Sequence, residues 1–272
     1  MTSRTLLGLG AFQWTALIAA FLSLLVVAEA WLGHYRSGFP LRAQYAPLAS
    51  GCVLALASVA AVVAPRAEGA RAALAVAAWI AIVSGLVGVG YHHWYGIVEK
   101  AGGYRWLLHY LMYGAPKLAP LALAAAGVLT LVVAAGLAGE ATLGGVALRR
   151  VLYGVVAVAL IGAILQAGIL HYRGAFNTPV MYGPLLVPPL AVFGVGWLAI
   201  APGAGIAGVT RVLLWLTVLT SFVGLGMHLR GLDRQMGGLW LWRMNLLQGP
   251  PPLAPATFAS FAAIGLVTLD LL

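Results

Sequence analysis

The sequence predicts an all-α, polytopic membrane protein with eight transmembrane helices, arranged as two tandem (parallel) four-helix-bundle repeats. Of its 272 residues, 62% are hydrophobic and only 8% are charged, whereas a soluble domain carries about 25% charged residues. The apolar runs approach or exceed the roughly 20 residues that a helix needs to cross the hydrocarbon core. They are unbroken, which excludes the alternating pattern of a membrane β-barrel, and so apolar a chain is not disordered.

Each predicted span is an apolar run bounded by charged residues or by turn-forming Gly and Pro. The first run has no Asp, Glu, Lys or Arg from Leu6 to Ala28. It is longer than the roughly 7–15 apolar residues of a signal peptide, so we expect it to be retained as the first span. The expected spans are residues 10–33, 44–64, 72–94, 117–138, 150–171, 181–201, 210–229 and 250–270.

Short motifs recur in the same order in the two halves of the chain. The block 34–36 (His-Tyr-Arg) recurs at 171–173, and the blocks 88–92, 102–103 and 114–120 recur at 224–228, 237–238 and 249–255. We therefore expect a first four-helix repeat over residues 1–139 and a second over residues 140–272. An even number of spans returns the chain to its starting side, so both repeats enter the membrane in the same orientation, about an axis along the membrane normal.

The charge distribution indicates a membrane surface and excludes nucleic acid as the partner. The net charge of +9 comes from 15 Lys and Arg against 6 Asp and Glu. The basic residues lie singly or in pairs at the ends of apolar runs, where they reach the interface and set topology. We expect contact with the lipid bilayer, in a multi-pass protein of the plasma (inner) membrane. Cys52 is the only cysteine, so no internal disulfide forms.

All six histidines fall on one predicted face of the membrane. His34 and His171 end the first helix of each repeat, and His92 and His228 end the third. Within a four-helix bundle these helices could face each other and bring two imidazoles to a similar depth. Such a pair could hold a haem iron axially, with haem b as the first expectation, or could share a Cu or Fe ion.

Three further residues accompany the histidines. Arg36 and Arg173 close the repeated blocks and would meet haem propionates or another anionic group. Glu29 precedes His34 by five residues, and its counterpart in the second half is Gln166. A carboxylate inside an apolar run is costly, so Glu29 is expected to bind the metal, to orient a ligating histidine or to relay protons.

The same residues also have explanations that need no cofactor. A His-Tyr-Arg triplet at a helix end is typical of an interfacial anchor, in which the aromatic ring and the long basic side chain reach the headgroups. Glu29 could pair with an arginine at the same end of a neighbouring helix. His92 and His228 could likewise make only interfacial hydrogen bonds, so for all seven residues the structural and the functional interpretation remain open at this point.

Three functions follow from these alternatives. The first is an integral membrane redox protein that passes electrons between a quinol and a partner. The second is a structural or anchor subunit of a larger respiratory or photosynthetic complex, which binds lipid or quinone and has no cofactor of its own. Other membrane or peripheral subunits are the expected partners in both. The third is a small-molecule transporter, which the shortage of charged residues within the spans disfavours.

Two four-helix halves with a histidine pair in each are similar in architecture to the haem A synthase family. That family's glutamate-plus-histidine helix motif is not matched in position. Glu29 and His34 are five residues apart, and Gln166 stands where the second half would need the acid. The likeness is one of architecture, and no residue roles are carried over from it.

Overall fold

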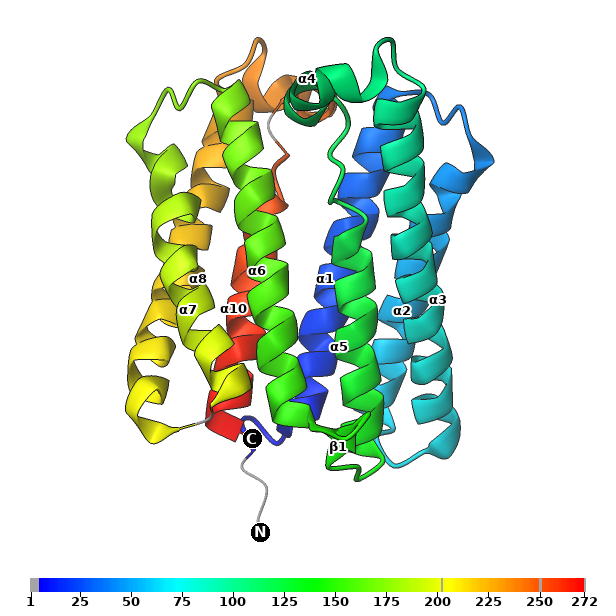
Figure 1. The fold of residues 1–272 in the computed structure, drawn as a ribbon, viewed down its shortest axis with the longest axis vertical. Helices are drawn as coiled ribbons and strands as arrows, with labels where there is room; N and C mark the ends of the chain where they lie inside the picture. The colour runs from blue at the N-terminus through cyan, green and yellow to red at the C-terminus, as the bar shows by residue number, and fades with distance from the viewer. Residues whose placement is uncertain (1–4, 202, 250, 272) are drawn as a thin grey trace.

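The computed structural model describes residues 5–201, 203–249 and 251–271, and within them the chain is almost wholly helical (Figure 1). The ends of the predicted repeats at residues 1 and 272, and Pro250 in the last predicted span, lie outside the described residues. The long helices of the first half are α1 (Ala11–Arg36), α2 (Ala46–Val63), α3 (Glu68–His93) and α5 (Leu121–Leu137). Those of the second half are α6 (Leu148–Arg173), α7 (Gly183–Ile200), α8 (Ala204–Asp233) and α10 (Ala254–Leu271).

Short elements connect the long helices in the same order in both halves. A 3₁₀ turn precedes the second long helix of each half, and a 3₁₀ turn followed by a two-turn helix precedes the fourth. These elements are η1 (Arg42–Tyr45), η2 (Trp94–Val98, a π turn), η3 (Gly103–Trp106) and α4 (Leu107–Tyr113), then η4 (Pro179–Tyr182), η5 (Gly238–Leu241) and α9 (Trp242–Gln248). A small hairpin of β1 (Thr142–Leu143) and β2 (Val146–Ala147) joins the halves.

Six helices of the described chain are long and apolar enough to cross a membrane, so the chain is a multi-pass membrane protein by length and composition. At 1.5 Å per residue, a 26-residue helix such as α1 spans about 39 Å, more than the roughly 30 Å hydrocarbon core. The six run over Ala11–Arg36, Arg42–Val63, Glu68–Val98, Leu148–Arg173, Pro179–Ile200 and Gly205–Asp233.

The fourth and eighth predicted spans, 117–138 and 250–270, begin too early. Their apolar helices start only at Leu121 and Ala254. The residues before them form what we term the pre-helix segments, 114–120 in the first half and Gly249 with 251–253 in the second, which are not helical. Both are rich in proline, which lacks an amide donor and forces the preceding residue out of the helical conformation.

The two halves meet along their first and fourth helices. Within each half the long helices pack in a ring, with α3 along α5 and α1 along α2, and with α8 along α10 and α6 along α7. Helices α1, α5, α6 and α10 form the centre, while α2 and α3 lie on one flank and α7 and α8 on the other (Figure 1). One apolar core runs through both halves, and it includes Leu22, Leu129, Leu160, Leu214 and Phe261.

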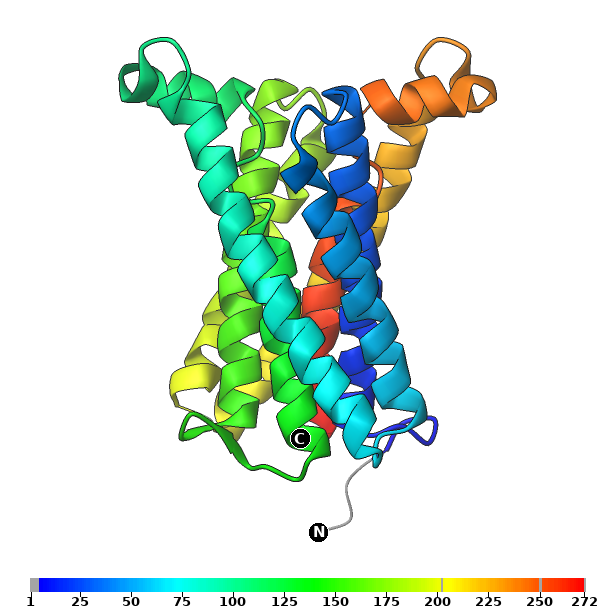
Figure 2. The same cartoon turned by 90° about the vertical axis from the view of Figure 1, so that its right-hand side faces the viewer.

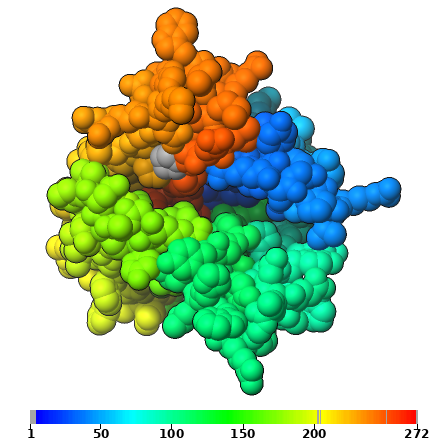
Figure 3. Space-filling model, turned by 90° about the horizontal axis from the view of Figure 1, so that it is seen from above, coloured from blue at the N-terminus to red at the C-terminus, as the bar shows by residue number. Residues whose placement is uncertain are grey.

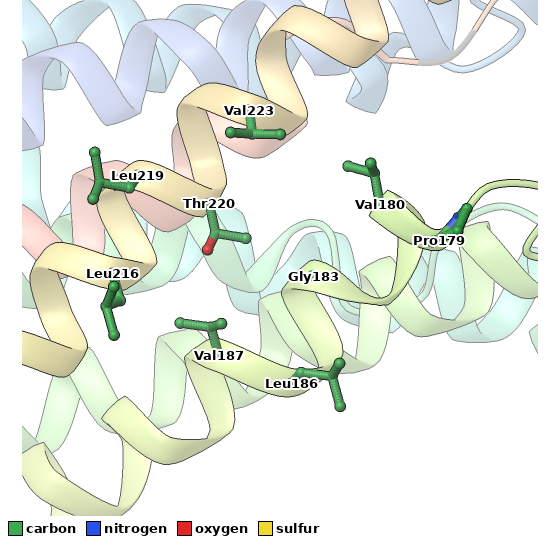
Figure 4. Close-up of a pocket in the computed structure, with 9 residues that line it drawn as sticks. All are labelled: Pro179, Val180, Gly183, Leu186, Val187, Leu216, Leu219, Thr220 and Val223. Atoms are coloured by element: carbon green, nitrogen blue, oxygen red, sulfur yellow. The ribbon is translucent and has the colours of Figure 1, made fainter.

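The flanks present large apolar side chains to the surroundings, as a lipid-facing surface does. Leu56, Phe193 and Ile200 are each more than 70% exposed, which water would not favour over such an area. An open groove between α7 and α8 is lined by apolar side chains apart from Thr220 (Figure 4). No charged or readily ionised side chain lines it, so its chemistry suits an acyl chain and not a catalytic step.

The connections η3–α4 and η5–α9 project sideways from the bundle at one end of the molecule, on opposite sides (Figure 2). They carry exposed aromatic and long apolar side chains, including Trp106 and Trp240, of which Trp240 is 96% exposed. Amphipathic rings of this kind favour the membrane–water interface. The histidine-bearing helices α1, α3, α6 and α8 all end at this end of the bundle (Figures 1 and 2).

Replacing Gly85 with Leu should separate α3 from α5 and destabilise the protein. A Cβ at Gly85 would lie 2.7 Å from the Ala124 nitrogen and 2.8 Å from the Pro120 carbonyl oxygen, and overpacking of this kind costs about 1–3 kcal/mol. We expect the thermal unfolding midpoint in detergent to fall by several degrees. Gly162→Leu is the control, because a Cβ there meets nothing within 4 Å; equal midpoints for the two variants would contradict the described packing.

Candidate functional site

The structure brings the four predicted histidines together as two pairs, one in each half. The ring centres of His34 on α1 and His92 on α3 are 6.1 Å apart, and their planes are inclined at 80°. The ring centres of His171 on α6 and His228 on α8 are 6.3 Å apart, with planes inclined at 63°. The first and third long helices of each half therefore converge at their histidines.

Backbone carbonyls fix the orientation of three of the four imidazoles. His92 Nδ1 donates to the Pro116 carbonyl at 2.7 Å, and His228 Nδ1 donates to the Pro251 carbonyl at 2.6 Å. His171 Nδ1 donates to the Met181 carbonyl at 2.7 Å. Because a carbonyl oxygen only accepts, each Nδ1 carries the proton and each Nε2 keeps a free lone pair. This is how metal-binding histidines are commonly held.

The separation within each pair fits two imidazoles on opposite sides of one metal ion. An imidazole nitrogen lies about 2.0 Å from a metal that it binds, and the ring centre lies about 1.1 Å behind it, so two such ring centres are about 6 Å apart. The observed separations of 6.1 and 6.3 Å agree with this value. With this spacing, the two imidazoles of each pair could hold a haem iron between them, and the haem would supply one-electron chemistry there.

A metal ion held by protein ligands alone finds less support. Within the part of the chain that the structure describes, no group of three or more His, Cys, Asp and Glu side chains is placed to hold a metal ion. Each histidine pair supplies two nitrogens, whereas protein-bound Zn, Cu and Fe ions generally take three or more protein ligands. Glu29, predicted as a further metal ligand, does not complete such a group.

The two predicted arginines cross from one half to the other. Arg36, at the end of α1, donates to the carbonyls of Leu246 and Gly249 in the second half, at 3.2 and 3.4 Å. Arg173, at the end of α6, donates to the carbonyls of Met112 and of Gly114 in the first half, the latter at 2.7 Å. The expected contact with propionates remains a prediction, but both guanidinium groups already bind backbone.

Glu29 also reaches across the boundary between the halves. Its carboxylate accepts a hydrogen bond from the backbone of Leu253, just before α10, and it interacts electrostatically with Arg36. One carboxylate oxygen, Oε1, is buried without a hydrogen-bond partner. Arg36 lies on the same helix as Glu29, so the expected pairing with an arginine of a neighbouring helix is not what the structure shows.

Lys117 is the site residue that reasoning from sequence did not single out. Its ammonium nitrogen Nζ is buried without a hydrogen-bond partner, and it lies against the backbone at Gly96 and Gly114. The positive charges of Lys100 and Arg173 act on it, and it in turn acts on His92. The sequence does distinguish Lys117 from the rest of its repeated block, because Pro252 occupies the matching position in the block 249–255.

The histidine face is hollowed near its centre, between the two halves (Figure 3). The end of α1 (blue), the α9 segment (orange) and the α4 segment and end of α6 (green) surround the hollow (Figure 3). The carbonyls that Arg36 and Arg173 bind belong to the orange and the green segments, respectively. The cross-contacts between the halves thus accompany the histidine pairs at this face.

No family model, no curated protein and no solved structure matches the chain. The chemistry of the site therefore rests on its own residues. These are two imidazole pairs, two arginines that join the halves, and one buried group of each charge.

Replacing Arg36 or Arg173 with Leu should loosen the contact between the halves. Each change removes the hydrogen bonds to two carbonyls at the exposed face, at a net cost of about 0.5–1.5 kcal/mol for each bond. We expect each variant to unfold several degrees below the parent. Arg243→Leu is the matched control, since Arg243 lies over the Trp242 ring and joins no halves. A midpoint equal to that of the control would argue against the bridging role.

Proposed function

We propose that this protein is an integral membrane redox protein whose two histidine pairs each hold a haem b and which exchanges electrons with a quinol. His34 and His92 would be the axial ligands in the first half, and His171 and His228 in the second. A bound haem supplies a reversible one-electron carrier. The plasma (inner) membrane is the proposed location, because quinols dissolve in its bilayer.

The observation that carries the proposal is the pairing of imidazoles at the spacing of axial ligands. His34 and His92 are 58 positions apart in the sequence, and His171 and His228 are 57 positions apart. The ring centres nevertheless lie at nearly equal separations in the two pairs. An interfacial anchor needs no such convergence, because each polar side chain would reach the headgroups on its own.

We also propose that the chain consists of two tandem repeats, over residues 1–139 and 140–272. Contacts near the histidines recur in both halves, which supports this division. Phe39 stacks on Tyr45 with ring centres 4.7 Å apart, and Phe176 stacks on Tyr182 at 4.6 Å. The backbone φ angle is 50° at Phe39 and 47° at Phe176, an unusual left-handed conformation that unrelated segments would rarely share.

Eight crossings are part of the same proposal. Helix α5, of 17 residues, is about 26 Å long and falls just short of a roughly 30 Å core. The pre-helix segment ahead of it continues in the same direction past the end of α3, where Pro120 contacts the positions of Gly85 and Gly88. Non-helical backbone is tolerated at such a depth where protein covers it, and α10 has the same arrangement.

A structural or anchor subunit is the alternative that a specific observation favours. Trp240 of η5 is 96% exposed, and Met236, just before η5, is 89% exposed. Such a surface could also meet another membrane subunit. This alternative predicts stable copurification with other subunits and no cofactor in the chain itself.

An absorption spectrum of the purified, detergent-solubilised full chain tests the proposal. We expect a Soret band, reduced-minus-oxidised α and β bands of haem b, and about two haems per chain. His92→Ala and His228→Ala should each remove about half of the haem, and the double variant nearly all of it, because each change takes one axial ligand from one pair.

The control is His109→Ala, because His109 contacts Tyr110 and Tyr113 and has no histidine opposite it among the contacts described. It should retain the haem content of the parent. A protein from haem-replete membranes with no Soret band would overturn the proposal. So would equal haem loss in the control and in the paired-histidine variants.

A further inference from the structure

The two histidine pairs are alike in geometry but unlike in charge. Lys117 follows Pro116, whose carbonyl accepts the Nδ1 proton of His92. Its Nζ is buried and has no hydrogen-bond partner. It lies so close to the backbone at Gly96 that a side chain there would collide with it. The Lys117 ammonium group therefore lies near His92 of the first pair. It is one residue from Pro116, whose carbonyl orients the His92 ring.

No acid among the described residues neutralises this cation. The groups that act on its charge are Lys100 and Arg173, both positive. Glu99, the neighbouring acid in the chain, accepts a hydrogen bond from the Trp94 indole at 2.7 Å. The ion pair that the described chain does contain, Arg211 with Asp270, lies on α8 and α10, near the ends of those helices far from the histidines.

The second pair has a different set of charges at the matching positions. Pro252 stands for Lys117, and Gln235 stands for Lys100. Arg36 corresponds to Arg173 and binds the second half as Arg173 binds the first. In addition, Glu29 brings a carboxyl group to Leu253, two residues after the carbonyl that orients His228. Lys117, the cation that acts on His92 of the first pair, thus has a proline in its place in the second half.

A positive charge favours the form of a redox centre that carries one more electron, and a poorly solvated site weakens this effect less than water does. We propose that Lys117 makes the histidine pair of the first half the higher-potential centre of the two. With a haem bound at each pair, an electron that enters at the second pair would pass to the first, so that the second centre would lose the electron that the first gains. This inference rests on the proposed function.

Potentiometric titration of the purified full chain, followed by the haem absorption bands, tests the inference. The parent should titrate in two one-electron steps whose equilibrium constants differ at least about tenfold, which corresponds to 59 mV for a one-electron couple. His228→Ala removes the second centre and should leave the higher step, which assigns that step to the first half.

Lys117→Met should lower the higher midpoint by about tenfold in the equilibrium constant and leave the lower midpoint in place. Lys117→Arg is the matched control, because it keeps the charge and should stay within a few-fold of the parent. Pro252→Lys provides an independent test, since a cation placed beside Pro251 should raise the lower midpoint.

Several results would overturn the inference. They are midpoints that do not move in Lys117→Met and Pro252→Lys, a Lys117→Met effect on the lower step only, or a single two-haem step in the parent. In each of these the Soret band is present, so the haem proposal stands while the inequivalence of the two centres falls. A parent without a Soret band removes both.

Discussion

The structure depends on supplying hydrogen-bond donors to backbone carbonyls where the chain is not helical. A backbone group left unpaired in an apolar setting costs as much as a lost hydrogen bond or more. The carbonyls of Gly114 and Pro116 accept hydrogen bonds from Arg173 and His92. In the second half, the carbonyls of Gly249 and Pro251 accept hydrogen bonds from Arg36 and His228. The need to supply donors to these carbonyls thus orients one imidazole in each half and joins the two halves through the arginines.

Most of the fold could be predicted from the sequence because length and hydrophobicity alone determine where apolar helices run. Six helices reach spanning length where the apolar runs indicated them. The starts of α5 and α10 could not be predicted in this way, because hydropathy does not register that Pro116 and Pro251 interrupt the backbone ladder. The same prolines create the exposed carbonyls, so this error and the central constraint of the structure have one cause.

The pairing of the histidines was predictable from the repeat, since His34 and His92 end the first and third helices of a bundle and residues at such ends can meet. The partners of Arg36, Arg173 and Glu29 were not, because they lie in the opposite half. Contacts between the halves leave no periodic signal in the sequence. Lys117 was overlooked for the opposite reason: a repeat directs attention to what recurs, whereas its importance lies in Pro252 being different.

Electron paramagnetic resonance of the oxidised full chain tests most directly whether each histidine pair clamps one iron. Two imidazoles on one ferric iron give a low-spin centre, and ring planes inclined at 80° and 63° should give strongly anisotropic low-spin signals with a large principal g value. The account predicts two such signals, one lost in His92→Ala and the other in His228→Ala. High-spin iron in the parent protein, or iron signals indifferent to both substitutions, would contradict it.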